Sequence, residues 1–205
     1  DGYLDNYVYA WPILQRYGLK ATIFAITGLI GEGAARAYLG AAKALPATPD
    51  HRAGKAAVAE GRADEVMLRW SEIQAMEASG AVEIHSHTHS HVRWDQLHTD
   101  KAQRLAAVEA DLKAARAALK THLGKDSRHL CWPWGYFEPE YQSIASDLGF
   151  TAQYATAKGV NTVGTDIRSI PRIVVKDKAA RWLAVRAWIY SQPMLGRLYS
   201  RWRGV

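Results

Sequence analysis

Four histidines at alternate positions are the residues of this chain best suited to chemistry. They make up half of its 8 histidines and lie within the segment Ala81–His91, as His85, His87, His89 and His91. Imidazole nitrogens are common ligands of divalent transition metals. In a helical turn, His87 and His91 would share a face and could reach one metal ion, whereas in a continued strand all four would point the same way. The alternative is a histidine-rich tract that binds metal loosely or lies in solvent.

A short buried strand is expected to deliver these histidines. Val82 and Ile84 alternate with polar neighbours, and Gly80 before them is typical of the end of a helix. The histidines therefore follow the carboxyl end of a strand. Along the chain strand patterns alternate with helix patterns, which favours an α/β fold with a parallel sheet, open or closed into a barrel. In either architecture the site lies where strands end and loops begin.

The other expected elements follow from periodicity and from turn residues. Helices are expected over 6–17, from a capping box of Ser71 and Gln74 to residue 79, from Asp100 and Gln103 to Gly124, and over 140–148. The third of these helices carries an apolar stripe for core packing, formed by Leu105, Val108, Leu112, Ala115 and Leu119. Further strands are expected over 21–26, from 129 into a turn, and over 150–154 and 170–175. Residues from about 31 to 64 form an irregular helical excursion without a chemical signature.

Composition and charge limit the class of protein. With 205 residues and 48% hydrophobic residues the chain can bury one full core, and its single cysteine, Cys131, excludes an internal disulfide. The net charge of +6 is concentrated at the end, where eight Lys/Arg face one acid from Arg172 onward, interleaved with aromatic residues. Such a mixture suits a membrane surface, nucleic acid or an anionic polymer. The plainer interpretation is an amphipathic helix docked on the body with its basic face solvated, broken or restarted at Pro193.

Three motifs occur in a fixed order. Asp1-Gly2-Tyr3 resembles the end of Thr-Phe-Asp-Asp-Gly, His87-Thr88 with His91 resembles His-(Ser/Thr)-x-x-His, and Trp132-Pro133-Trp134-Gly135 resembles a Pro-aromatic-Gly turn. In this order and spacing the chain resembles the NodB-type polysaccharide deacetylases, carbohydrate esterase family 4, from Asp1 to about Val175. Ile170-Pro-Arg-Ile is similar to a segment of members that act on exopolysaccharides such as poly-N-acetylglucosamine.

The resemblance implies a fold, a reaction and a site. The fold would be a distorted (β/α) barrel with its first strand missing from the chain, as a deacetylase domain over 1–175 followed by a basic, aromatic helical tail over 176–205. The reaction would be metal-dependent hydrolysis of N-acetyl groups from an N-acetylhexosamine-containing polysaccharide, with release of acetate. The protein would lie in the cell envelope or be secreted to the periplasm or the extracellular space. The tail would contact a membrane or an anionic polymer, and no nucleic acid is expected. The implied ligands of a divalent metal, Zn²⁺ before Co²⁺, Ni²⁺ or Mn²⁺, are Asp1, His87 and His91. The implied substrate-binding residues are Pro133, Trp134, Gly135 and Tyr136.

The sequence departs from the family pattern at three points. Cys131 stands where an Arg often orients the catalytic base, and no histidine follows His129 to serve as the usual general acid. The base itself would precede Asp1, and in poly-N-acetylglucosamine deacetylases the acid also lies in a segment before the first motif. We therefore expect the base and the acid upstream of Asp1, and the chain as given to be an incomplete enzyme.

Two other functions fit parts of the pattern. A non-catalytic, carbohydrate-binding relative would keep the fold without turnover. Amidohydrolases also place His-x-His at the end of a barrel strand, and His85-Ser-His87 or His87-Thr-His89 would fit, but they need further histidines on later strands. For His85 and His89 a structural role is favoured over that of a substitute acid.

Overall fold

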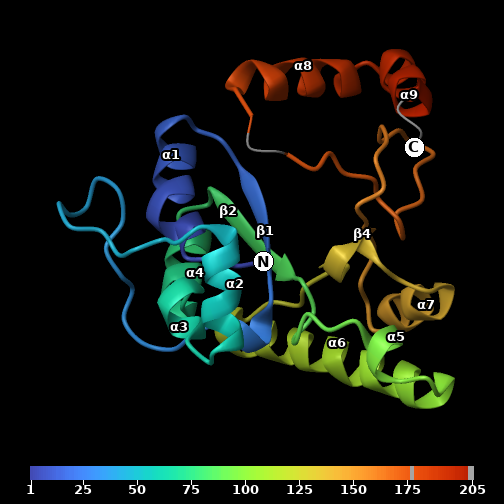
Figure 1. Ribbon diagram of the computed structural model, residues 1–205, viewed down its shortest axis with the longest axis horizontal. Coiled ribbons are helices and arrows are strands. Elements are labelled where there is room, and N and C mark those ends of the chain that lie inside the picture. The colour runs from blue at the N-terminus through green and yellow to red at the C-terminus, as the bar shows by residue number, and fades with distance from the viewer. Residues whose placement is uncertain (176–177, 203–205) are drawn as a thin grey trace. The chain divides into compact units, whose positions relative to one another are not determined.

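The computed structural model describes residues 1–175 and 178–202, which belong to two compact units divided after Ser127 (Figure 1). The first unit contains η1 (Asn6–Ala10), α1 (Trp11–Arg16), β1 (Ala21–Ala25), η2 (Thr27–Leu29), α2 (His51–Ala59), α3 (Ala63–Val66), α4 (Trp70–Ala78), β2 (Val82–Ser86), α5 (Trp94–Leu97) and α6 (Lys101–Leu123). The second contains β3 (His129–Cys131), η3 (Pro133–Gly135), α7 (Pro139–Asp147), β4 (Ala152–Tyr154), α8 (Ala180–Ser191) and α9 (Pro193–Trp202). The predicted domain boundary at 175/176 stays a prediction, because residues 176–177 lie outside the described part of the chain.

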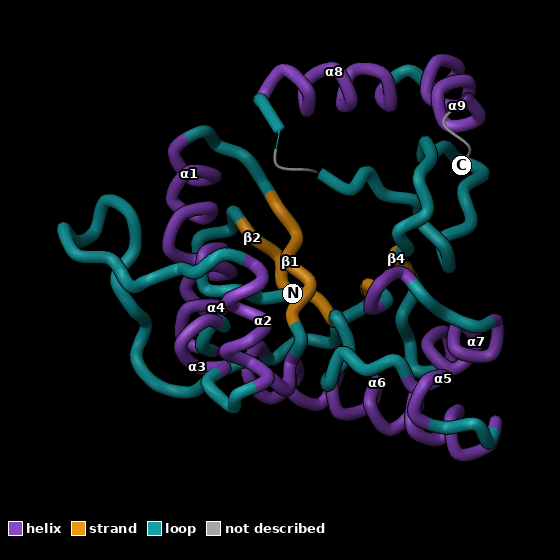
Figure 2. The backbone as a smooth tube through the Cα atoms, in the orientation of Figure 1, coloured by secondary structure: helices purple, strands orange, loops and turns teal. Residues whose placement is uncertain are grey.

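A parallel pair of strands organises the first unit. β1 pairs with β2 in a register that runs from Ala21↔Val82 to Ala25↔Ser86, and Figure 2 shows the two strands side by side. Val82 and Ile84 of β2 are buried as predicted, and α4 and α6 both contact this strand. β1 is less buried than its apolar sequence predicts, since Thr22 is exposed. The pair ends with Ala25 and Ser86 at the same edge, where the histidines begin.

The start of α4 corrects the predicted capping box. The helix begins at Trp70, so that Glu72 is its third residue, and the Glu72 carboxylate accepts a hydrogen bond of 2.9 Å from the Arg69 N–H. Ser71 and Gln74, the predicted box, instead donate to the carbonyls of distant residues. The fully buried Glu72 also pairs with Arg36 at 2.7 Å, and this contact holds the irregular excursion against the core.

The long helix α6 follows the prediction at both ends. The Asp100 carboxylate caps it by accepting from the Gln103 N–H at 2.8 Å, and Gly124 ends it with a φ of 67°. Four residues of the predicted apolar stripe are buried, namely Val108, Leu112, Ala115 and Leu119, whereas Leu105 is half-buried. A carboxylate that was not predicted, that of Asp111, is buried beside them.

The second unit contains its own parallel pair and the C-terminal helices. β3 pairs with β4 from His129↔Ala152 to Cys131↔Tyr154. The prediction of a strand over 170–175 is wrong. Ile170 forms one isolated bridge with Tyr154, but residues 171–175 have no strand structure. The predicted break at Pro193 is confirmed, since α9 starts there after α8. No helix among the described residues is long and apolar enough to cross a membrane.

Candidate metal site

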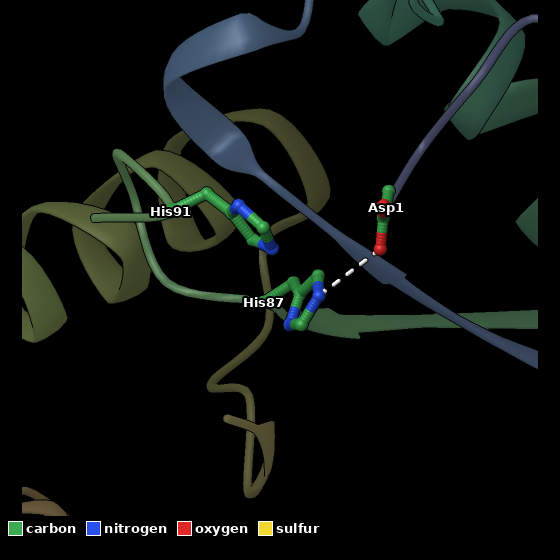
Figure 3. A group of neighbouring side chains, drawn as sticks. All are labelled: Asp1, His87 and His91. Carbon is green, nitrogen blue, oxygen red and sulfur yellow. Dashed lines mark ion pairs between the residues drawn. The ribbon is translucent and has the colours of Figure 1, made fainter. Parts of the chain in front are cut away.

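Three of the predicted site residues come together in the first unit. The Asp1 Oδ1 lies 3.0 Å from the His87 Nε2, and the ring centroids of His87 and His91 lie 4.8 Å apart (Figure 3). One ligand atom from each of the three side chains lies within 4.8 Å of the other two. Asp1 is exposed, His87 is buried and His91 is half-buried, so the group opens to solvent at its carboxylate.

The backbone that brings His87 and His91 together is neither of the two predicted forms. β2 ends at Ser86, and residues 87–91, which we call the histidine turn, form neither helix nor strand. Thr88 and His91 have φ angles of 66° and 55°, a left-handed conformation that side chains other than glycine seldom adopt. The Thr88 Oγ1 accepts from the His91 N–H at 3.1 Å and so stabilises the turn. Strained backbone of this kind gathers at functional sites.

The end of β1 anchors two of the ligands. The His87 N–H donates to the Ala25 carbonyl at 2.9 Å, and the Ile26 N–H donates to the Asp1 carbonyl at 3.2 Å. Next to Asp1, Gly2 has a φ of 86°, and a Cβ there would lie 3.1 Å from the Ile30 side chain. A glycine is therefore required beside Asp1, for both its conformation and its close packing.

The Asp111 carboxylate of α6 holds the second half of the histidine turn. It accepts hydrogen bonds from the backbone N–H groups of His89 and Ser90, at 3.2 and 3.0 Å, and from the Ser90 Oγ at 2.6 Å. A buried carboxylate is costly unless such donors satisfy it. Sequence reasoning missed this residue, and the signal for it was an acid beside the apolar stripe of α6.

The donor set suits a divalent transition metal. Burial, together with the neighbouring His87, lowers the pKa of His91 from 6.5 to about 3, which leaves its imidazole neutral and able to donate a lone pair near pH 7. Two imidazoles and one carboxylate are a typical ligand set for a catalytic metal that keeps open positions. His85 and His89 are not members of the group. The Nδ1 of His85 lies 3.1 Å from the Ser127 Oγ, and that of His89 lies 3.0 Å from the Thr27 Oγ1.

The predicted substrate-binding residues form a tight turn in the second unit. In η3, Trp134 has a φ of 54° and a ψ of 5°, and its side chain is 49% exposed. Gly135 follows with a φ of 71°, and a Cβ there would lie only 2.2 Å from the Thr156 Oγ1. The turn thus requires glycine at 135 and presents an indole to solvent. Trp134 joins Thr88 and His91 as the non-glycine residues with positive φ in the described chain.

Other predicted residues near this turn have local contacts. Pro133 is buried, and the Tyr136 hydroxyl donates to the Glu138 carboxylate at 3.2 Å. Cys131, which replaces the arginine of the family pattern, is buried with its Sγ 3.9 Å from the Trp132 carbonyl oxygen. A thiol in this position cannot form the charged, bidentate hydrogen bonds by which arginine orients a carboxylate.

Comparisons with known proteins show which proteins this chain resembles in sequence and fold. The chain is 22% identical over 189 residues to the poly-beta-1,6-N-acetyl-D-glucosamine N-deacetylase of Staphylococcus aureus (strain MRSA252), a match that covers 90% of this chain and 56% of that protein. It resembles the structure of IcaB from Ammonifex degensii with a TM-score of 0.66 and 25% identity, over 93% of this chain and 70% of that one. It resembles the BpsB deacetylase domain from Bordetella bronchiseptica with a TM-score of 0.62 and 20% identity, over 84% of this chain and 67% of that one.

These matches confirm the predicted deacetylase-type α/β fold and favour it over the amidohydrolase alternative. The chain spans just over half the length of the curated relatives it matches. Members of the matching family generally depend on a divalent metal ion, in agreement with the ligand group at Asp1. A family model described as polysaccharide deacetylase matches residues 1–153, about three quarters of the chain, and the protein therefore belongs to the polysaccharide deacetylase family.

Proposed function

We propose that this protein removes N-acetyl groups from an N-acetylhexosamine polysaccharide by hydrolysis, with Asp1, His87 and His91 as the ligands of a divalent metal ion. The observation that carries the proposal is the convergence of their ligand atoms within 4.8 Å of one another. Zinc is the first choice of metal, because two imidazoles and one carboxylate suit it, with cobalt, nickel and manganese as alternatives.

Each ligand has a defined part in this proposal. His91 stays neutral near pH 7 because of its low pKa, and so it offers a lone pair without first losing a proton. Asp1 supplies one negative charge at the exposed side of the group. A divalent ion held there would lower the pKa of a bound water towards ~7 and polarise an acetyl carbonyl. Hydrolysis of the amide also requires a base for the water and an acid for the departing sugar amine. None of the three ligands is proposed for either role.

The proposed substrate is a β-linked N-acetylglucosamine polymer of the cell envelope or the extracellular matrix. Its support is the poly-beta-1,6-N-acetyl-D-glucosamine named for the Staphylococcus relative and the exposed indole of Trp134, since aromatic faces pack well against sugar rings. Pro133, Gly135 and Tyr136 are proposed with it as substrate-binding residues, because the tight turn that they form with Trp134 presents its indole to solvent.

A non-catalytic, carbohydrate-binding role is the second candidate. The buried Cys131 favours it, because the residue that orients the base in the family pattern is replaced by a neutral thiol. The two functions differ in one observable, the release of acetate.

The test is acetate release from β-1,6-linked N-acetylglucosamine oligomers by the protein in its natural full length, with Zn²⁺ and with a chelator. Deacetylation predicts release with the metal, none with the chelator, and a loss of at least about 10²-fold in His87→Ala. His98→Ala is the matched control, since His98 lies outside the ligand group, and it should keep full activity. Binding of oligomers without acetate release would favour the second candidate. Release that persists in the chelator would contradict the metal assignment.

A further inference from the structure

We propose that helices α8 and α9 dock on a membrane surface that contains anionic phospholipids, with one side of α9 entering the lipid interface. This inference concerns the C-terminal part of the second unit and does not depend on the proposed deacetylation. It rests on which side of α9 is exposed, on the charge of both helices and on a cavity beside α8. Figure 1 shows where the two helices lie in the chain.

Helix α9 exposes its apolar side. At about 100° per residue, four large apolar residues lie within about 100° of arc. They are exposed by 79%, 44%, 60% and 78%, in the order Met194, Leu195, Leu198 and Trp202. The opposite side carries Gly196 and Ser200, which are buried, and a Cβ at Gly196 would lie only 2.3 Å from the Val160 side chain. The helix therefore packs through its small residues and presents its large apolar residues to solvent. An ordinary surface helix, and the helix expected from the sequence, would instead pack its apolar side on the body of the protein.

The charge of this segment is uniformly positive. From Lys178 to Val205 the sequence contains six Lys/Arg and no Asp or Glu. Arg181 and Arg197 are exposed on α8 and α9. Interfacial helices that bind anionic lipids combine these features, an apolar side with tryptophan and flanking cations.

A cavity of about 390 Å³ lies beside α8, within the size range of small-molecule sites. Three cations and three aromatic rings line it, Lys158, Lys178, Arg186, Trp182, Tyr190 and Tyr199, and none of the described lining residues is acidic. The guanidinium carbon of Arg186 lies 5.2 Å from the Trp182 ring centroid and 4.9 Å from that of Tyr199. Stacking of this kind orients the guanidinium and leaves its edge N–H groups able to bind a phosphate. We assign the cavity to the phosphate of a lipid headgroup.

An anionic membrane surface can contact the exposed apolar side of α9 and the cationic cavity beside α8 at the same time. Nucleic acid or a soluble acidic polymer would engage the cations and the rings of the cavity, but neither needs an exposed apolar side on α9. A second copy of the chain could cover the apolar side, but it would bring the same positive charge to the contact. Charge complementarity thus favours an anionic lipid surface.

The test is co-sedimentation of the full chain with vesicles of phosphatidylcholine alone and of phosphatidylcholine with phosphatidylglycerol. We expect binding to the anionic vesicles only, weakened by salt. The variant Leu198→Ser/Trp202→Ser should bind about tenfold more weakly or worse, and Lys178→Gln/Arg186→Gln should lose the preference for anionic lipid. Val163→Ser, which changes an exposed apolar residue of the same unit outside these helices, is the matched control and should bind like the wild type.

Circular dichroism spectra should show that all the variants keep their helices, since the substituted side chains at 198 and 202 are exposed. Vesicle binding that is unchanged in Leu198→Ser/Trp202→Ser would overturn the proposal. So would an absence of vesicle binding combined with salt-sensitive binding to DNA or to a soluble acidic polysaccharide. A dimer in solution that Leu198→Ser/Trp202→Ser dissociates would assign the apolar side to a second copy instead.

Discussion

The Oδ1 of Asp111 accepts hydrogen bonds from both the backbone N–H and the side-chain hydroxyl of Ser90, at 3.0 and 2.6 Å. Ser90 immediately precedes His91, so this contact ties a metal-ligand candidate to helix α6. The histidine turn also contains two non-glycine residues with positive φ, whose conformation costs energy. A buried carboxylate that gathers several donors offsets part of this cost.

Asp111→Asn should therefore weaken metal binding by about tenfold, because contacts that orient metal ligands contribute on this scale. The amide retains one acceptor but cannot satisfy the same donors with a full negative charge. Zn²⁺ affinity measured by competition with a chromophoric chelator checks this. Glu109→Gln, two residues away on the same helix and paired with Lys113, is the control and should leave the affinity unchanged. An equal affinity in wild type and Asp111→Asn would show that the turn keeps its shape without the carboxylate.

Glu72→Gln should lower the free energy of unfolding by about 3 kcal/mol, since it leaves the charge of Arg36 without its partner in a largely buried position. It also weakens the cap of α4 at Arg69. Urea denaturation provides the measurement. Glu60→Gln is the control, because its pair with Arg62 is exposed to solvent and should contribute little to stability. Similar losses in both variants would mean that the buried pair does not anchor the excursion.

The stability of the metal-free protein should fall in acid through His91. The pKa of His91 in the folded protein is about 3, below its ordinary 6.5, so the unfolded chain takes up this proton first. Above about pH 7 His91 is neutral in both states and does not change the free energy of unfolding. As the pH falls through 6.5 the unfolded chain takes up the proton and the free energy of unfolding falls, until the loss levels off near pH 3. Thermal melts in chelator across this range should show a shallower loss in His91→Gln. Parallel curves for the two proteins would contradict the lowered pKa.

Trp134→Ala should weaken the binding of N-acetylglucosamine oligomers by up to about tenfold, the scale of one lost aromatic contact, with little effect on folding because the side chain is half exposed. Calorimetric titration measures the affinity. Trp188→Ala, which removes an indole exposed by 60% on α8, is the matched control. Oligomer binding that survives in Trp134→Ala but is lost in Trp188→Ala would move the sugar site to the C-terminal helices.

The sequence predicted most elements because local signals set them. The alternation at Val82 and Ile84 predicted β2, the pair of Asp100 and Gly124 predicted both ends of α6, and Pro193 predicted the break between the last two helices. The α4 cap was misplaced because Ser71 and Gln74 fit the capping-box pattern, whereas Arg69, the residue that precedes the helix, does not. The contacts of Glu72 with Arg69 and Arg36 set the start of the helix instead.

The sequence predicted which residues form the ligand group, but not the backbone conformation that brings them together. The positive φ of Thr88 and His91 opposes their intrinsic preferences, so no local rule predicts it. Asp111 is remote in sequence from the histidines, and its role depends on how α6 packs against β2. The prediction of a strand over 170–175 was wrong because an apolar run indicates only that a segment can be buried. It does not show that a neighbouring strand is available to pair with it.

The most direct test of the central claim is the metal content of four purified proteins, the wild type, His87→Ala, His91→Ala and His98→Ala, after equilibration with Zn²⁺ and removal of the excess. The account predicts about one equivalent of zinc in the wild type and in His98→Ala, and much less in the other two, because each loses one of three protein ligands. One equivalent in all four would contradict the assignment of the site to Asp1, His87 and His91.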